Sequence, residues 1–546
     1  MNTHKRLDCI VIGYNELPFE EYETTIRNWG ENSEAYRDLK FSFVNLEGRK
    51  LDYVSLLNHA WGLANNHHQE IEGRREFESG DIPNLASVYL TWFLRKRGLE
   101  AKYINLFQLE KDKLAEYLAD DPYCVAITTT FYLLNFPVNE IVEFIRSRNS
   151  RVKIVVGGPL VANHIRNYSD GKLQAMLEDM GADYYVSDSQ GELTLWRIVE
   201  CLRNRGEISS VPNLIYFSDG KMKHTQTLPE NNSLDENYID WTSFPDQGLG
   251  RTIQTRTARS CAFSCSFCNY PARAGKLTLA DIGTFEKELD SIRKLESVEN
   301  LVFIDDTFNV PLDRFKEMCR LMISKNYKFN WFSYFRCSNS DEEAIDLMAR
   351  SGCKGVFLGI ESGSPTILKN MNKAATIEKY VKGISLLRER EILTFASFIL
   401  GFPGETAETI NETSSFIRET APTYYRAQMW YCEPGTPVDR NREKYKISGK
   451  GFMWEHMTMD SMEAMDQIER LFLSIKESQW LPQWSFDFWV IPYLLGKGVS
   501  LDRFRNFMTS ANKMLALEIA SLPWREKAAL QQEYKRELVE ALRPNC

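Results

Sequence analysis

Two successive series of alternating strand-like and helix-like segments constrain the fold of this chain more than any other feature. Helix-like stretches separate the strands of the first series, and one of them, 85–97, ends at Gly98, a typical C-terminal cap. This alternation predicts an α/β, doubly wound parallel sheet of the flavodoxin-like type. Residues 18–80 are polar and irregular and are interpreted as an insertion after the first strand. The predicted strands are 8–14, 101–106, 123–129, 152–158, 183–186 and 213–217.

A polar stretch at 218–241 precedes the second series, whose six βα units predict a partial (β/α)6 barrel with function at the C-terminal ends of its strands. From about residue 441 the pattern becomes helical and rich in Trp, Met and Phe, and 480–489 is interpreted as the core of a helical C-terminal cap. The predicted domains are therefore 1–235, 236–440 and 441–546. The predicted barrel strands are 251–257, 299–306, 329–336, 355–362, 394–401 and 424–431.

The charge and the apolar runs restrict the partners. The net charge of −9 and the pI near 5.6 argue against broad binding to nucleic-acid phosphates. No apolar run approaches the length of a membrane span, and residues 1–16 lack the apolar core of a signal peptide. We therefore expect a cytoplasmic protein that binds neither nucleic acid nor membrane.

Three cysteines form a tight group directly after the first barrel strand. Cys261, Cys265 and Cys268 have the spacing C-x3-C-x2-C, whereas the remaining cysteines of the 11 are scattered, which favours reduced thiols over disulfides. Three thiolates in one loop can hold three irons of a 4Fe–4S cubane and leave the fourth iron open. The alternative is a structural zinc site, but zinc usually takes four protein ligands, and no histidine lies nearby in the sequence.

The triplet, with an aromatic residue before its last cysteine, resembles the motif of the radical S-adenosylmethionine (SAM) superfamily. The resemblance implies that the open iron binds the amino and carboxylate groups of SAM, and that an electron from the cluster cleaves SAM to methionine and a 5′-deoxyadenosyl radical. It also implies SAM contacts at the ends of the barrel strands, although a helix cap or a solvated loop remains the alternative for each carboxylate. These are Phe267 near adenine, Asp305 or Asp306 at the amino group, Arg336 at the carboxylate, Glu361 and Ser362 at the ribose segment, and Ile399 and Gly401 in the adenine segment.

A flavodoxin-like domain before such a barrel resembles the cobalamin-dependent class of radical SAM enzymes. None of the 7 histidines has an aspartate two positions before it, so the D-x-H-x-x-G sequence that supplies a cobalt ligand is missing. The resemblance therefore implies base-off cobalamin without a histidine ligand, while a cofactor-free substrate platform remains the alternative. The candidate cobalamin contacts follow the strands: Tyr14, Asn15, Thr128, Thr129, Thr130, Gly157, Gly158, Pro159, Gln190, Gly191 and Glu192.

The whole length resembles a group of cobalamin-dependent radical SAM methyltransferases through the segments 9–23, 431–440 and 451–464. This group includes the phosphorus methyltransferase of phosphinothricin biosynthesis and pyrrole carbon methyltransferases of aminocoumarin pathways. It implies methyl transfer from SAM through methylcobalamin to an unactivated carbon or phosphorus of a small or carrier-bound biosynthetic substrate, with flavodoxin or ferredoxin as reductant. Candidate substrate contacts, for whose aromatic members packing is the alternative, are Tyr425, Arg426, Gln428, Trp430, Trp454 and His456.

Three other functions remain open. A cobalamin-dependent cyclase or rearrangement enzyme has the same two domains. A methylthiotransferase needs three further cysteines for a second cluster, but Cys9, Cys124 and Cys201 are widely spread in the sequence. A zinc-binding or corrinoid-binding protein without catalysis is the third.

Overall fold

A computed structural model of the chain describes residues 6–64, 76–78, 81–132, 134–244, 248–484, 486–520 and 523–543. The chain forms two compact units. The first unit comprises Met1–Leu17, Gly80–Leu249 and Glu286–Leu295, and the second comprises Pro18–Ser79, Gly250–Phe285 and Glu296–Cys546. This division differs from the predicted three domains. The segment 18–79 groups with the barrel, and the helices after 441 form no unit of their own.

The first unit contains a seven-stranded sheet with the order β4-β1-β5-β6-β7-β8-β9. Its parallel strands are β1 (Cys9–Tyr14), β4 (Ala101–Leu106), β5 (Cys124–Thr128), β6 (Lys153–Gly157) and β7 (Tyr184–Val186). Their order is that of flavodoxin, as predicted. Every residue of β5 is buried, because helices cover both faces at the centre of the sheet.

The sixth predicted strand differs from expectation in its direction. β8 (Leu214–Ser218) runs antiparallel to β7 and forms a hairpin with β9 (Lys221–His224). Asp219 and Gly220 form the turn, and both have positive φ angles, 53° and 69°. Such a two-residue turn matches the twist of a hairpin, whereas the apolar run of β8 by itself does not reveal strand direction.

Helices surround this sheet. They are α4 (Leu85–Arg95), α5 (Lys111–Ala119), α6 (Phe136–Arg148), α7 (Pro159–Asn167), α8 (Asp170–Met180) and α9 (Glu192–Arg203). α4 begins at Asn84, whose side chain accepts a hydrogen bond from the Ser87 amide. The core contains apolar residues from alternate strand positions, such as Ile10 and Ile12 of β1, packed against these helices.

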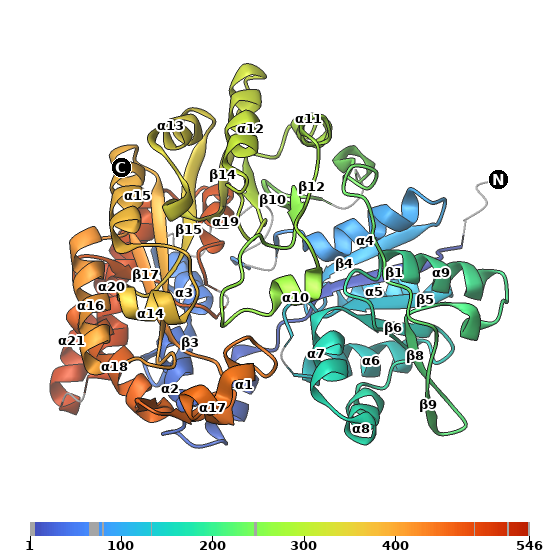
Figure 1. Ribbon diagram of the computed structural model, residues 1–546, viewed down its shortest axis with the longest axis horizontal. Coiled ribbons are helices and arrows are strands. Elements are labelled where there is room, and N and C mark those ends of the chain that lie inside the picture. Colours follow the sequence, from blue (N-terminus) through green and yellow to red (C-terminus); the bar gives the residue numbers. More distant parts are fainter. Residues whose placement is uncertain are drawn as a thin grey trace. The chain divides into compact units, whose positions relative to one another are not determined.

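The second unit contains a seven-stranded parallel sheet with the order β10-β13-β14-β15-β16-β17-β21. All six predicted barrel strands are present, and Figure 1 shows the connecting helices α12 (Leu312–Ser324), α13 (Glu342–Arg350), α15 (Ile377–Glu389) and α16 (Ala407–Thr420) along this sheet. The strands are β10 (Thr252–Thr255), β13 (Asn300–Phe303), β14 (Asn330–Phe335), β15 (Cys353–Glu361), β16 (Leu393–Leu400), β17 (Tyr424–Met429) and β21 (Gln479–Trp480).

The interpretation of 480–489 as the core of a C-terminal cap is confirmed only in part. Phe486 packs against Phe504 and Phe507 of the helix 501–519, with ring centroids 5.9 Å apart in both pairs. Trp480, however, belongs to β21, the seventh strand of the barrel sheet, and the Phe488 ring packs against Phe395 and Phe332 of the barrel at 5.8 and 6.0 Å. An aromatic run indicates burial but not which core buries it, and here the barrel and the C-terminal helices share it.

The inserted segment 18–79 has structure of its own and packs on the C-terminal helices. Its elements are α1 (Phe19–Arg27), α2 (Glu34–Leu39), β2 (Phe43–Leu46), β3 (Arg49–Asp52) and α3 (Tyr53–Ala64). Arg37 forms ion pairs with Asp466 and Glu469 of α18 (Ser461–Ser474), at 2.7 and 2.9 Å. In Figure 1, α2 and α3 (blue) lie beside α18, α20 (Leu501–Ile519) and α21 (Trp524–Leu542). None of the helices described is long and apolar enough to cross a membrane.

Candidate active site

One contact between a strand and a helix identifies which side chains point into the barrel. Phe398 of β16 packs against Phe416 of α16, with ring centroids 6.2 Å apart, so it points outward. Its neighbours Ser397 and Ile399 therefore point into the barrel, because side chains alternate along a strand. Ser397 is paired with Gly359 of β15 and Arg426 of β17, so these positions also face the interior.

The three cysteines lie in the loop after β10. The Cys268 amide donates to the Cys265 carbonyl at 3.1 Å, and the Tyr270 amide donates to the Cys268 Sγ at 3.4 Å. Ser266 anchors this loop through its amide, which donates to the Met371 carbonyl at 2.8 Å. Burial raises the pKa of the Cys268 thiol, and the Tyr270 amide opposes this by stabilising the thiolate.

The type of metal centre at the cysteine loop follows from the number of its thiols. A structural zinc ion usually takes four protein ligands, whereas three thiolates can each bind a different iron of a cubane. The described residues contain no group of three His, Cys, Asp or Glu side chains that could hold a metal ion. The assignment of Cys261, Cys265 and Cys268 to a cluster therefore stays a prediction.

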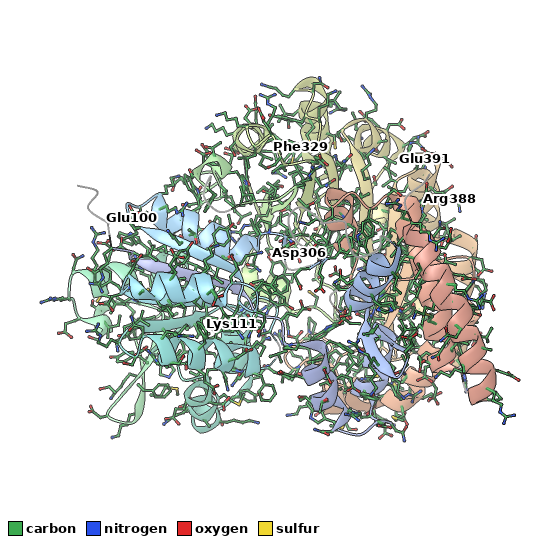
Figure 2. All side chains as sticks on the ribbon, turned by 180° about the vertical axis from the view of Figure 1, so that it is seen from behind. Glu100, Lys111, Asp306, Phe329, Arg388 and Glu391 are labelled. Atoms are coloured by element: carbon green, nitrogen blue, oxygen red, sulfur yellow. The ribbon has the colours of Figure 1, made fainter. Side chains whose placement is uncertain are left out.

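The structure separates the two adjacent aspartates after β13. Asp305 is 2% exposed and accepts hydrogen bonds from the Thr257 amide, the Thr257 hydroxyl and the Ala258 amide, at 2.7, 2.6 and 2.8 Å. Its carboxylate therefore holds the backbone that leads into the cysteine loop. Asp306, labelled in Figure 2, is exposed to solvent. Desolvation by the protein around it and repulsion from Asp305 nevertheless raise the pKa of Asp306 to about 6.

Arg336 directly follows β14 and is 6% exposed. Its guanidinium carbon lies 3.6 Å from the centre of the Phe263 ring, inside the cysteine loop. The Nε and Nη2 atoms have no hydrogen-bond partner in the described part of the chain. A buried guanidinium with free donors is a strong binding group for a carboxylate.

Glu361 ends β15 and forms a buried ion pair with Lys373, with 3.1 Å between Oε1 and Nζ. Glu361 has a φ angle of +71°, and such strain in a non-glycine residue is typical of functional sites. The Lys373 Nζ also lies 5.5 Å from the centre of the Phe267 ring. No pattern in the sequence indicates a role for Lys373, because its partner lies 12 positions away across a helix. Ser362 is fully buried and bonded to Thr413 at 3.2 Å, which indicates a packing role.

The tail of the chain supports the end of β16. A side chain at Gly401 would lie 2.5 Å from the Trp454 ring, and His456 bonds the Gly401 carbonyl at 3.0 Å. The Trp454 indole donates to the Trp430 carbonyl at 2.7 Å. Trp430, Trp454 and His456 are all 5% exposed or less, so their contacts favour packing over substrate binding.

The other candidate substrate residues lie on β17. Tyr425 points away from the interior because it alternates with Arg426, and its ring packs edge-on to Trp480 at 5.4 Å. Arg426 and Gln428 point into the barrel, beside Ser397 and Ile399. Of the predicted substrate contacts, these two have the appropriate orientation.

The candidate cobalamin residues lie at one edge of the first sheet, at the ends of four adjacent parallel strands. Asn15 after β1 is 1% exposed, and its amide group donates to the Pro137 carbonyl and the Glu140 carboxylate at 2.9 and 3.0 Å. The Tyr14 ring stacks on Tyr132 at 6.1 Å. Through these hydrogen bonds, Asn15 stabilises this edge of the sheet.

The loops after β5 and β6 are bonded to each other. Thr129 donates through its hydroxyl to the Gly157 carbonyl at 2.9 Å, and Thr128 donates to the Gly13 carbonyl at 2.7 Å. A side chain at Gly158, whose φ is +109°, would lie 2.9 Å from the Thr129 Oγ1. Thr130 is exposed, and Gly157 to Pro159 are half-buried, so these residues remain accessible to a ligand.

The loop after β7 is held by the segment 230–232. The Gln190 side chain donates to the Glu230 carbonyl at 3.0 Å, and Glu192, 5% exposed, accepts from Asn232 at 2.9 Å. Gly191 has a φ of +76° and approaches Val186 closely. The side chains of Glu192 and Gln190 therefore stabilise the loop after β7.

Sequence reasoning missed the exposed aromatic rings at the same edge. Phe131 and Phe136 follow β5 and are 60% and 53% exposed, and Leu134 between them is 38% exposed. Large apolar side chains that remain uncovered often mark a binding surface. Their signal in the sequence was the FYLLNF run directly after the strand end.

Comparison with known proteins agrees with this geometry. Residues 255–417 match the family model of the radical SAM superfamily. An uncharacterized methyltransferase of Pyrococcus horikoshii, PH0819, is 25% identical over 58% of this chain and 68% of its own length. The anaerobic magnesium-protoporphyrin IX monomethyl ester cyclase of Rubrivivax gelatinosus is 23% identical over 72% of this chain and 73% of its own length.

Two solved structures share the fold. The radical SAM methyltransferase TsrM of Kitasatospora setae, with cobalamin and a [4Fe-4S] cluster bound, has a TM-score of 0.58 and 18% identity over 84% of this chain and 97% of that one. The cobalamin-dependent radical SAM enzyme OxsB, with aqua-cobalamin and SAM bound, has a TM-score of 0.53 and 14% identity over 98% of this chain and 72% of that one. Residues 255–417 therefore form a domain that matches the radical SAM superfamily, and the chain shares the fold of TsrM and OxsB.

Proposed function

We propose that this enzyme is a cobalamin-dependent radical SAM methyltransferase. It transfers a methyl group from SAM, through cobalamin, to an unactivated carbon or phosphorus of a small biosynthetic substrate. The observation that carries the proposal is the presence, in one chain, of a radical SAM barrel with a cysteine triplet and a flavodoxin-like sheet with an accessible ligand edge. TsrM and OxsB combine the same fold with bound cobalamin.

Two residues at strand ends are suited to the methionine part of SAM. Asp306 offers an exposed carboxylate to the amino group, while Asp305 is already occupied by the backbone of 257–258. Arg336 offers two free nitrogens to the carboxylate. We therefore assign the amino contact to Asp306, and Asp305 positions the cysteine loop.

The ribose and adenine contacts are assigned to the next two strand ends. Glu361 accepts a bond from Lys373 through one oxygen, and its other oxygen can accept from the ribose hydroxyls. Ile399 faces the interior beside Gln428, where it offers an apolar surface to adenine. Gly401 leaves no room for a side chain of its own, since Trp454 fills that space.

Cobalamin is assigned to the C-terminal edge of the first sheet, the side on which doubly wound sheets bind ligands. Thr130, Gly157 and Pro159 supply accessible backbone there, and Phe131 supplies an apolar ring. Of the histidines in the described part of this unit, His164 is bonded to Asn135 at 2.9 Å, and His224 lies on the edge strand β9. This arrangement supports base-off cobalamin without a histidine ligand.

The bound groups supply the chemistry, which consists of radical formation from SAM at the cluster and methyl donation at cobalt. The protein binds and orients them. No general base is needed to remove a hydrogen atom. A flavodoxin or ferredoxin is proposed as the source of electrons.

A cyclase is the second candidate, because the Rubrivivax relative, aligned over 72% of this chain, is named for that reaction. A methylthiotransferase is less favoured, although a putative one of Methanocaldococcus jannaschii is 24% identical over 58% of this chain and 69% of its own length. A methylthiotransferase needs three further cysteines for a second cluster. Cys9 and Cys124 lie side by side in the buried sheet, with 3.6 Å between their sulfurs, whereas Cys201 lies on α9.

The experiment is anaerobic reconstitution with iron, sulfide and cobalamin, followed by turnover with SAM that carries a trideuterated methyl group. A product heavier by one labelled methyl group supports the methyltransferase. A product without the label, formed together with 5′-deoxyadenosine, would favour a cyclase or rearrangement enzyme. Normal iron and SAM binding without retention of cobalamin would contradict the assignment of the first sheet.

A further inference from the structure

Arg426 is a buried cation whose hydrogen-bonding groups are largely unused. It is 3% exposed, and its Nε and Nη1 atoms have no partner among the residues that the structure describes. It forms an ion pair with Asp38 of α2, at 3.4 Å between Nη2 and Oδ1, which is long for a charge-assisted hydrogen bond. Burial of unused guanidinium donors is unfavourable, so a ligand is expected to satisfy them.

Two carboxylates and a phenol act electrostatically on this guanidinium. Asp38, Asp487 and Tyr53 interact with it electrostatically, and we call these four residues the Arg426 cluster. Burial raises the pKa of Asp487 to about 6, against the effects of the Trp489 amide and Arg426. The Tyr53 hydroxyl has no partner among the described residues. The Asp38 side chain keeps 23% of its surface uncovered.

The cluster lies inside the barrel and one layer below the proposed adenine contact. Arg426 is in register with Ser397, two residues before Ile399, which corresponds to about 7 Å along the strand. Gln428, the next inward residue on β17, is in register with Ile399. A substrate held at Arg426 can therefore extend past Gln428 toward the place where the radical forms.

The charges of the cluster define the ligand. With one guanidinium and two carboxylates, the fully ionised cluster has a formal charge of −1, so an anion alone would increase the excess of negative charge. A cation alone would leave the free Arg426 donors unsatisfied. A group with a protonated amine next to a carboxylate satisfies both, and the assigned site for the amino acid end of SAM combines the same residue types, Asp306 and Arg336.

We propose that the Arg426 cluster anchors the methyl acceptor through an α-amino acid group, with the carboxylate at Arg426 and the ammonium between Asp38 and Asp487. This inference rests on the proposed function, because it takes the barrel interior as the place of the substrate. It also gives a role to the inserted segment 18–79, which supplies Asp38 and Tyr53.

The test is saturation-transfer NMR on the reconstituted holoenzyme with saturating SAM, so that the methionine-binding end is already filled. The probes are L-alanine, propionate, which lacks the amine, and isopropylamine, which lacks the carboxylate. L-alanine is expected to give at least a fivefold stronger signal than either of the others, since loss of one partner of a buried polar contact costs about 1–3 kcal/mol, or roughly 5- to 150-fold. An equal signal from propionate, or none from L-alanine, overturns the proposal.

Two variants locate the signal. Arg426→Gln and Asp487→Asn should each reduce it at least fivefold, whereas Arg418→Gln, on the outer helix α16, should not change it. If Arg426→Gln does not fold, the signal in Asp487→Asn alone tests the proposal. A signal that survives Asp487→Asn overturns the proposal. The proposed function is tested by a different measurement from this NMR signal. It would be contradicted if the wild-type enzyme neither transferred the label nor cleaved SAM.

Discussion

The Lys373 ammonium lies 3.1 Å from the Glu361 carboxylate, and both side chains are buried at the end of the fourth barrel strand. Lys373 comes from the segment that also anchors the cysteine loop, because Ser266 bonds the Asn370 and Met371 carbonyls, both at 2.8 Å. One short segment after α14 (Pro365–Asn370) therefore positions both the proposed cluster ligands and the proposed ribose contact.

Lys373→Met should lower the free energy of unfolding by about 3 kcal/mol, because it leaves the Glu361 charge buried without a partner. It should also weaken SAM binding. Glu361→Gln in the same chain should restore much of the stability but not the affinity, as measured by denaturant unfolding and by equilibrium binding of SAM. Lys379→Met, an exposed change on α15, is the control. Equal losses of stability in the two lysine variants would mean that the ion pair has no special role.

Asp306 should make SAM binding depend on pH. Its pKa is raised to about 6, so the carboxylate is ionised above this pH and becomes protonated below it. Since only the ionised form attracts the ammonium of SAM, affinity should fall by up to about tenfold for each pH unit below 6. Asp306→Asn should bind SAM weakly and without this dependence near pH 6. If the variant keeps the same pH profile, another group is responsible.

Cys265→Ala should abolish 5′-deoxyadenosine formation, since each thiolate of the triplet holds a different iron. The measurement is 5′-deoxyadenosine after reduction with dithionite, together with the iron content. Cys319→Ala should keep both, because Cys319 lies buried on α12 and burial raises the pKa of its thiol to about 12. Normal SAM cleavage by the Cys265 variant would remove this residue from the cluster.

The sequence predicts the strands of both sheets except β9 and β21, because nearly continuous apolar runs alternate with amphipathic helices. It also places the site residues at strand ends, since that follows from the parallel arrangement alone. It cannot separate Asp305 from Asp306, because the two residues are identical and adjacent in the sequence. The distinction comes from the hydrogen bonds that Thr257 and Ala258 donate to Asp305.

Contacts between distant parts of the chain are the other feature that the sequence does not predict. The segment 18–79 has no internal signal for its place, since Arg37 pairs with Asp466, 429 positions away. β21 consists of two residues, Gln479 and Trp480, and so is too short to produce an alternating pattern. Arg426 depends on a contact of the first kind, because its ion-pair partner Asp38 lies in the segment 18–79. Its unused donors therefore become visible only in the structure.

The last prediction concerns the lower face of cobalamin. In the reconstituted protein reduced to cob(II)alamin, the EPR spectrum should show no nitrogen splitting from an axial histidine. The structural reason is that His164, buried on α7, is bonded to Asn135, and its ring packs near Tyr168 at 5.4 Å. His164→Gln should therefore leave the spectrum unchanged. In contrast, Gly158→Ala should reduce cobalamin retention, because its φ of +109° disfavours a side chain and the added carbon would lie 2.9 Å from the Thr129 Oγ1. Cobalamin content after gel filtration measures this loss. A histidine signal that disappears in His164→Gln would show instead that this residue leaves Asn135 to bind cobalt.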